Sequence, residues 1–275
     1  MSHRFNLTAA LILVSCLVIA GYGVIAGRGR WEHRSVPDGR GVVRSFIVQA
    51  PERSDRVRPL ALTFVFHGRN GDASQAAGYG IQDAAGAADA SVFVFPQGTP
   101  FATDGVGWDD TCGGYDVVFF DNMLADLETR YRVDETKVFV AGFSWGCDFV
   151  TALACCRGNR IRGIAAAACS DEFRDPADYH TYANLACPVV NKAAIRFTHD
   201  AIGDNAYPAP LFASTSKLFR SMNACSSAAA QAAPGSCTTY AGCANSTLEC
   251  VKPGIGHSVG PNWGAETWAF FSALN

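Results

Sequence analysis

Residues 137–146 read KVFVAGFSWG, an apolar run that ends in a serine, Ser144, between two glycines. The apolar run predicts a buried strand, and the residues after it are compatible with a helix. A serine on a sharp strand-to-helix turn crowds the residues two positions away, and Gly142 and Gly146 remove the Cβ atoms that would collide. Such a G-x-S-x-G turn lifts the serine hydroxyl clear of the sheet, above a helix N-terminus that favours negative charge. A tight turn without chemistry is the alternative.

Short apolar runs alternate with helix-length segments along the chain. This alternation is typical of an α/β fold with a mostly parallel central sheet and helices on both faces. The expected strands are 45–49, 60–66, 92–95, 138–141, 161–167, 194–198 and 248–251, and the expected helices are 117–131, 147–156 and 263–274. Residues 226–236 are small and rich in alanine, so we expect a mobile surface loop there.

Residues 1–26 are predicted to be a signal peptide or an N-terminal membrane anchor. An apolar stretch follows His3 and Arg4 and is about long enough to cross a bilayer. Small residues near its end suit cleavage, whereas the arginines that follow suit an anchor, and the sequence before Cys16 resembles a lipoprotein box. Residues 27–44 would then be a leader. The expected location is extracellular or periplasmic, with membrane contact only through this segment.

The composition excludes some classes of protein. Apolar residues make up 49% of the chain, enough to bury a core, and the net charge of −3 without a basic cluster argues against nucleic-acid binding. The chain has 11 cysteines. Without Cys16 an even number remains, which predicts up to five disulfides in an oxidising compartment. Zinc binding is the competing interpretation, but the sequence contains no C-x-x-C pair.

A serine hydroxyl is a weak nucleophile at neutral pH and needs a neighbouring base. In this class of fold the chain order is serine, acid, histidine, and His257 follows the last expected strand in the loop PGIGH. The acid is expected after the preceding strand. We choose Asp204, in a loop between glycine and asparagine, where its carboxylate can accept the Nδ1–H of the histidine. Asp200, at the end of the strand, is the alternative, and Asp171 is a more distant one.

The loop after strand 60–66 is expected to complete the site. It begins with His67 and Gly68, which predicts that the backbone N–H groups of Arg69 and Trp145 form the oxyanion hole. His67 is expected to hold this loop in place and not to move protons. Trp108 and Trp263 are our candidates for substrate binding, with Trp145 and Phe101 as further aromatic residues, and core packing is the alternative for each of them.

Seven short segments together carry a family resemblance. They are FHG at 66–68, FPQG at 95–98, WDD at 108–110, YDV at 115–117, YRVD at 131–134, GFSWG at 142–146 and GH at 256–257. In combination they resemble the secreted feruloyl esterases and the related polyhydroxybutyrate depolymerase-like esterases of the α/β-hydrolase superfamily. The resemblance extends from residue 45 to the C-terminus and implies an α/β-hydrolase catalytic domain over 45–275.

This resemblance implies a serine esterase with the triad Ser144, Asp204 and His257 and with no metal or cofactor. The expected substrates are small or polymeric esters, above all feruloyl esters of plant cell-wall polysaccharide. Polyhydroxyalkanoates and acetylxylan are alternatives, and a non-catalytic surface or carbohydrate-binding protein is the alternative of another class. Two positions depart from the family pattern. The acid segment usually reads H-G-x-x-D, whereas Asp200 stands second here and an extra residue precedes the acid, and Cys147 replaces a usual glycine, which suggests a disulfide beside the turn.

Overall fold

The structure is a computed structural model that describes residues 29–52, 58–102, 104–170, 193–200, 202–206, 209–226, 230–233 and 236–274. The predicted targeting segment at 1–26 and the third candidate acid, Asp171, lie outside these residues. Within the described part of the chain, no helix is both long enough and apolar enough to span a bilayer.

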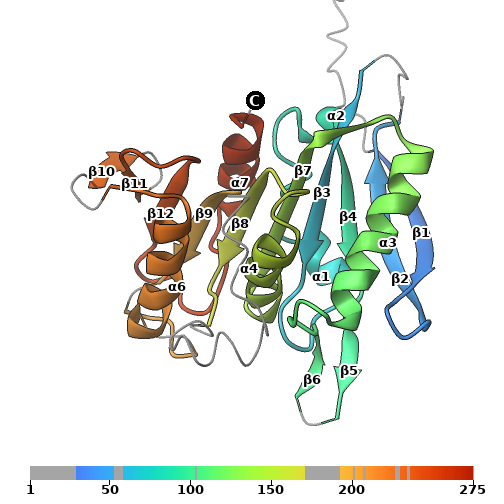
Figure 1. The fold of residues 1–275 in the computed structure, drawn as a ribbon, viewed down its shortest axis with the longest axis horizontal. Coiled ribbons are helices and arrows are strands. Elements are labelled where there is room, and N and C mark those ends of the chain that lie inside the picture. Colours follow the sequence, from blue (N-terminus) through green and yellow to red (C-terminus); the bar gives the residue numbers. More distant parts are fainter. Residues whose placement is uncertain are drawn as a thin grey trace, which may run out of the picture.

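A ten-stranded sheet runs through the centre of the described residues (Figure 1), in the order β1-β2-β4-β3-β7-β8-β9-β12-β11-β10. The six strands from β4 to β12 in this order are parallel to one another, and antiparallel strands complete both edges. A separate hairpin of β5 and β6 projects from one end of the sheet. The strands are β1 (Arg30–Pro37), β2 (Val43–Ala50), β3 (Leu60–Phe66), β4 (Ser91–Pro96), β5 (Thr99–Phe101), β6 (Gly105–Gly107), β7 (Val133–Phe143), β8 (Gly163–Ala167), β9 (Ala194–His199), β10 (Ala230–Ala233), β11 (Cys237–Tyr240) and β12 (Thr247–Val251).

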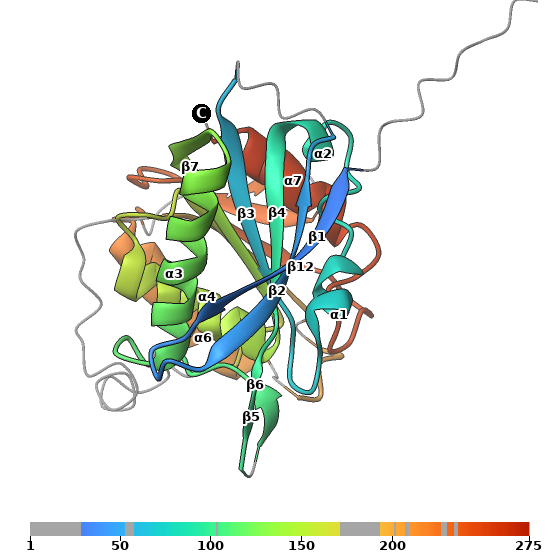
Figure 2. The ribbon, with the colours of Figure 1, turned by 90° about the vertical axis from the view of Figure 1, so that its right-hand side faces the viewer.

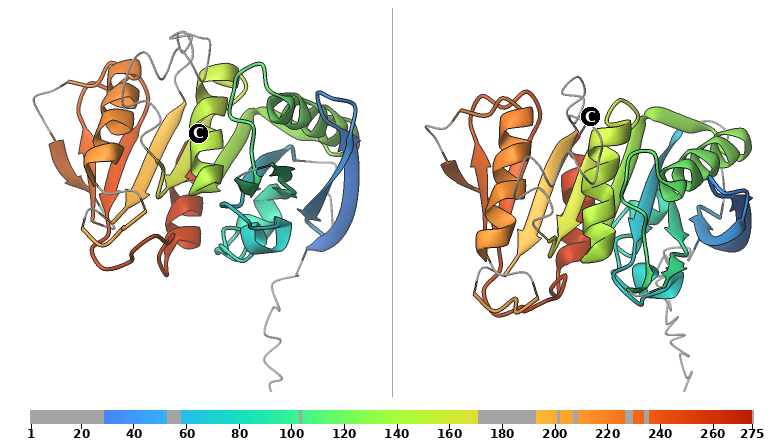
Figure 3. Two further views of the ribbon diagram at one scale, coloured as in Figure 1. Left: turned by 90° about the horizontal axis from the view of Figure 1, so that it is seen from below. Right: turned by 60° about the horizontal axis from the view of Figure 1, so that its bottom comes forward.

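Helices cover both faces of the sheet (Figures 2 and 3). The helices are α1 (Ala73–Ala77), α2 (Ala87–Ala90), α3 (Tyr115–Arg130), α4 (Trp145–Arg157), α6 (Ala209–Met222) and α7 (Trp263–Ser272). Alternate side chains of β3 point to opposite faces: Phe64 packs in the core beneath α3, α4 and α6, and Val65 packs in the core beneath α1, α2 and α7. The predicted α/β architecture is therefore confirmed, and each predicted strand and helix lies within a few residues of an observed one.

Two expectations about the edges of the sheet need correction. Strand β1 occupies the predicted leader and pairs with β2 along its whole length, so the sheet begins before the predicted domain start at 45. Strand β10 lies inside the predicted loop at 226–236 and pairs with β11, which follows that loop. Both are edge strands with a neighbour on only one side, and such strands need no apolar run. The sequences RWEHRSVP and AQAA therefore gave no strand signal.

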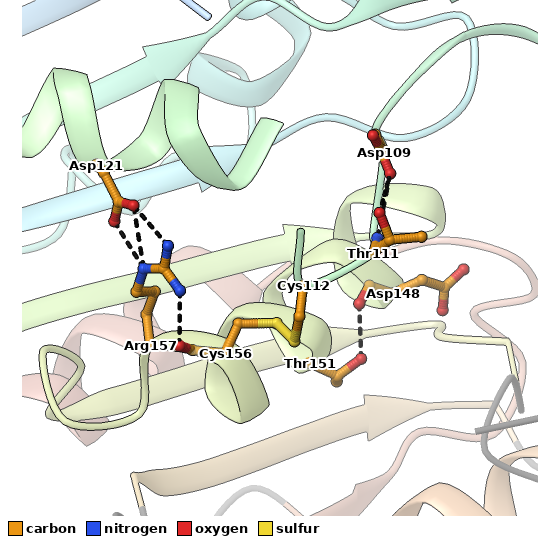
Figure 4. The surroundings of a disulfide bond; sticks show 8 residues. All are labelled: Asp109, Thr111, Cys112, Asp121, Asp148, Thr151, Cys156 and Arg157. Carbon is orange, nitrogen blue, oxygen red and sulfur yellow. Dashed lines mark hydrogen bonds and ion pairs between the residues drawn. A yellow bond between two sulfur atoms is a disulfide. The ribbon is translucent and has the colours of Figure 1, made fainter. Parts of the chain in front are cut away.

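Four disulfides are found among the described residues, and one of them, Cys147–Cys169, lies close to the Ser144 turn. Cys112–Cys156 joins the segment before α3 to the end of α4 (Figure 4). Cys147–Cys169 joins the first turn of α4 to the segment after β8, as the departure from the family glycine suggested. Cys225–Cys243 and Cys237–Cys250 hold the region of β11 and β12. These pairs fit an oxidising compartment and exclude zinc binding by the same thiols.

Replacing both Cys147 and Cys169 by alanine is expected to lower the free energy of unfolding by about 3 kcal/mol. The bond closes a loop across a sequence separation of 22 residues, and its loss frees that segment in the unfolded chain. Urea unfolding of the double variant and the parent protein measures the difference. Equal unfolding free energies would contradict the pairing, which peptide mapping of the unreduced parent checks independently.

Candidate active site

Ser144 stands on the turn between β7 and α4 with a strained backbone. Its φ of 55° and ψ of −125° lie in a region that costs a non-glycine residue free energy. The Ser144 N–H donates to the carbonyl oxygen of Ala167 at the end of β8 (3.0 Å), and its own carbonyl accepts from Cys147 (2.7 Å). The strained residue is therefore held by backbone hydrogen bonds on both sides, and its hydroxyl stands at the N-terminus of α4.

The two glycines of the motif are required by close backbone approach. A Cβ atom on Gly142 would overlap the carbonyl group of Gly146. A Cβ atom on Gly146 would lie 2.5 Å from the carbonyl oxygens of Phe66 and His67 at the end of β3. Real Cβ atoms do not approach oxygen so closely, so α4 can pack against β3 only with glycine at this position. This is the steric reason that the sequence motif predicts.

The three side chains predicted to form a triad meet at this turn. His257, in the loop between β12 and α7, places Nε2 2.9 Å from Ser144 Oγ. Its Nδ1 lies 3.1 and 3.0 Å from the two carboxylate oxygens of Asp204, in the loop after β9. The Asp204 side chain is fully buried, whereas the imidazole is 28% exposed. An imidazole in this position can take a proton from the hydroxyl while the buried carboxylate stabilises the resulting imidazolium.

Asp200, the alternative acid, binds backbone groups. One oxygen of its buried carboxylate accepts from Ile202 (3.0 Å) and Gly203 (2.9 Å), and the other accepts from Gly256 (2.9 Å) in the loop that carries His257. These hydrogen bonds, with that of Gly203 the largest contribution, lower the pKa of Asp200 to about 2. The structure thus brings the Asp204 carboxylate to His257 and uses Asp200 to connect two loops.

His67 holds the loop after β3, as expected. The ring is buried, its Nε2 lies 2.9 Å from the N–H of Gly98, and its Nδ1 lies 2.8 Å from the carbonyl oxygen of Gly68. Because Nε2 accepts a hydrogen bond, the ring proton resides on Nδ1 and the imidazole is neutral. Burial lowers the pKa of His67, in agreement with a neutral ring.

The β5–β6 hairpin fixes the backbone around Arg69. Asn70 donates its N–H to the carbonyl oxygen of Val106 (2.8 Å), and the N–H of Val106 donates to Asn70 Oδ1 (3.0 Å). Gly68 lies against the nucleophile, because a Cβ atom at that position would be 3.1 Å from Ser144 Cβ. Trp145 opens α4, and the first N–H groups of a helix have no acceptor within the helix. The two predicted oxyanion donors therefore belong to segments that adjoin Ser144: the loop after β3, which approaches it at Gly68, and the first residue of α4.

Comparisons with known proteins identify the fold of this chain. The fold is similar to that of acetyl xylan esterase from Aspergillus awamori (TM-score 0.65, 14% identity, covering 87% of this chain and 99% of that one). It is also similar to a ferulic acid esterase (TM-score 0.57, 15% identity, 90% and 96%) and to an S-formylglutathione hydrolase from Agrobacterium tumefaciens (TM-score 0.65, 12% identity, 90% and 96%). The chain has the α/β-hydrolase fold.

Sequence comparison adds curated relatives of this chain. Feruloyl esterase C of Emericella nidulans is 33% identical over 130 residues, which is 44% of this chain and 45% of the relative. Probable feruloyl esterase C of Aspergillus clavatus is 28% identical over 170 residues, 58% and 59% respectively. The chain thus spans about half the length of the curated relatives it matches, and no family model matches it. The resemblance to feruloyl esterases is confirmed.

The aromatic residues expected to bind substrate differ from the prediction. Trp108 and Trp263 are each 1% exposed, so neither offers a surface to a substrate, and core packing is the interpretation that fits. Trp108 stacks on Phe149 and donates its Nε1–H to the carbonyl oxygen of His67 (2.8 Å), which supports the loop after β3. Trp145, by contrast, is only partly buried. Sequence alone does not show which face of an aromatic ring meets solvent.

Replacing Gly146 by alanine is expected to destabilise the protein by about 1–3 kcal/mol, because the new methyl group would force β3 and α4 apart. Gly113→Ala is the matched control, since a Cβ atom there meets nothing within 4 Å. This control is expected to change the stability by about 0.5 kcal/mol or less. Urea unfolding of both variants makes the comparison. Equal stability of the two variants would contradict the packing of α4 on β3.

Proposed function

We propose that this chain is a serine carboxylesterase that hydrolyses esters of plant cell-wall polysaccharide, with feruloyl esters as its main substrates. The observation that carries this proposal is the hydrogen-bonded series from Ser144 through His257 to the buried Asp204. The similarity to curated feruloyl esterases supports the choice of substrate. A non-catalytic binding protein would not require a strained serine within 2.9 Å of an imidazole nitrogen.

In the proposed first step, Ser144 Oγ attacks the ester carbonyl carbon while His257 Nε2 takes the hydroxyl proton. The tetrahedral intermediate collapses, the C–O bond to the alcohol breaks, and His257 gives its proton to the departing alcohol oxygen. In the second step, His257 takes a proton from water as the water oxygen attacks the acyl-enzyme. Collapse of this second intermediate releases the acid, and the proton returns to Ser144. Asp204 remains ionised and stabilises the imidazolium in both steps.

The oxyanion of each intermediate is expected to accept hydrogen bonds from the backbone N–H groups of Trp145 and Arg69. The Trp145 group also carries the positive end of the α4 dipole. General-base catalysis and oxyanion binding are each expected to accelerate the reaction by about 10²–10⁴-fold. Both groups are fixed before substrate arrives, because the hydrogen bonds around the Ser144 turn and between Asn70 and Val106 are internal to the protein.

The proposed location is outside the cytoplasm, in the extracellular space or the periplasm. The disulfides among the described residues support it, because such bonds persist in oxidising compartments. The apolar segment at 1–26, read as a signal peptide or an anchor, supports the same location.

Hydrolysis of methyl ferulate, acetylated xylan and short polyhydroxybutyrate tests the proposal. Methyl ferulate is expected to give the highest kcat/KM. Ser144→Ala and Asp204→Asn are each expected to lose about 10⁴-fold or more in kcat, because the first lacks the nucleophile and the second cannot hold the imidazole in its working tautomer. Ser272→Ala, at an exposed helix position, is the control and should retain full activity.

Each outcome of this panel bears on a different part of the proposal. Faster hydrolysis of acetylated xylan or polyhydroxybutyrate than of methyl ferulate would contradict the substrate assignment but not the mechanism. Activity of Ser144→Ala equal to that of the parent protein would contradict the mechanism. Absence of hydrolysis of all three substrates would contradict the proposed substrate classes.

A further inference from the structure

We propose that Asp200 is a positioning residue whose carboxylate locks the loop that carries Asp204 to the loop that carries His257. The kinetic consequences rest on the proposed function, whereas the structural consequences do not. Asp200 does not take part in the proton transfers described above, and its carboxylate binds backbone N–H groups of both loops.

The two loops leave neighbouring strands at the same edge of the sheet. Strands β9 and β12 are parallel, and Val251 is the register partner of His199. Just beyond this pair, Lys252 donates its N–H to the carbonyl oxygen of His199 (2.8 Å), which is the last rung of the ladder. The loops therefore start side by side, but each must then hold its functional side chain without help from a strand.

Asp200 supplies the next connection. Its Oδ1 accepts from Ile202 (3.0 Å) and Gly203 (2.9 Å) and so shapes the turn that leads to Asp204. Its Oδ2 crosses to the other loop and accepts from Gly256 (2.9 Å), the residue directly before His257. A single buried carboxylate thus fixes the backbone next to both partners of the Asp204–His257 hydrogen bond.

The loop that carries His257 needs such a restraint. Gly254 and Gly256 have φ values of 84° and 62°, in the left-handed region that glycine adopts easily. Glycine-rich backbone has many alternative conformations, and a displacement of about 1 Å of a catalytic group can reduce the rate by about 10²-fold. Hydrogen bonds to an ionised carboxylate are about twice as strong as neutral ones, which suits this restraint.

A carboxylate is required because both of its oxygens accept. In Asp200→Asn the amide oxygen can serve only one side, and the NH₂ group then meets a backbone N–H on the other side, donor against donor. The pKa of about 2 means that Asp200 stays ionised, and the connection persists, throughout the neutral range. Asp200→Ser is a second variant whose shorter hydroxyl can still accept from its own turn.

Asp134→Asn is the matched control. Asp134 also accepts from a backbone N–H two residues further on, that of Thr136 (3.0 Å), and its pKa is also lowered, first by the hydroxyl of Thr136. It lies at the start of β7, and its contacts stay within that strand: the N–H and hydroxyl of Thr136 on Oδ1 and the ammonium group of Lys137 (3.8 Å) at Oδ2. The control therefore removes a carboxylate that also accepts from backbone, at a partly exposed position, without opening a connection between two loops.

The experiment measures kcat and KM on methyl ferulate per active site titrated with a fluorophosphonate, together with the NMR signal of the His257 Nδ1 proton. Asp200→Asn and Asp200→Ser are expected to lose at least about tenfold in kcat with KM changed by less than about twofold. Their Nδ1 proton signal is expected to shift or broaden, and Asp134→Asn is expected to match the parent. Hydrogen exchange of the Gly256 amide in the unmodified protein is expected to show protection.

An unprotected Gly256 amide would overturn the proposal even if neither variant folds. Unchanged kcat per titrated site and an unchanged Nδ1 signal in a folded Asp200 variant would overturn it as well. Should the parent protein hydrolyse no ester while its Nδ1 signal still depends on Asp200, the proposed function would fail and the positioning role would stand.

Discussion

The backbone of Ser144 is the constraint on which the rest of the site depends. A residue at φ 55° and ψ −125° does not stay there by its own preference, so neighbouring elements must hold it. The hydrogen bond to Ala167, the glycine contact between α4 and β3, and the Cys147–Cys169 bridge all act on this one turn. The nucleophile is thus placed by the backbone and not by its own side chain. The imidazole of His257 then needs only to come within hydrogen-bond distance of the Ser144 hydroxyl.

The order of strands in the sheet explains how distant residues reach the turn. Strands β7, β8, β9 and β12 are consecutive neighbours and parallel, so their carboxyl ends lie along one edge. Nucleophile, acid and base follow β7, β9 and β12 respectively, although Ser144 and His257 are 113 residues apart in the chain. In open α/β sheets this edge is where sites form, because the loops that follow the strands converge there. The strand order therefore brings the three loops close together, and the conformation of each loop sets the hydrogen-bond distances between the side chains.

The parts of this protein that could be predicted from sequence are those that depend on local pattern. Strands such as β3 and β4 are buried on both faces and therefore read as continuous apolar runs. The glycines on either side of Ser144 are needed because a Cβ atom would collide with nearby backbone, and their spacing is visible in the sequence. The edge strand β1 was missed because its side chains alternate between exposed and partly buried positions and include charges.

Other features depend on contacts that sequence spacing does not reveal. Asp200 and Asp204 both follow β9, and only the fold shows which carboxylate lies beside His257. The hydrogen bond from the Gly256 N–H to the Asp200 carboxylate joins residues 56 positions apart, so no local sequence motif predicts it. Trp108 and Trp263 illustrate the same limit, since their burial is a property of the assembled core.

Covalent labelling with a fluorophosphonate, followed by mass spectrometry of the modified peptide, tests most directly whether Ser144 is an activated nucleophile. The account predicts one label on Ser144 in the parent protein and a much slower reaction in His257→Ala, because the imidazole 2.9 Å away is what accepts the serine proton. A label on another residue, or equal labelling rates in the parent and in His257→Ala, would contradict it.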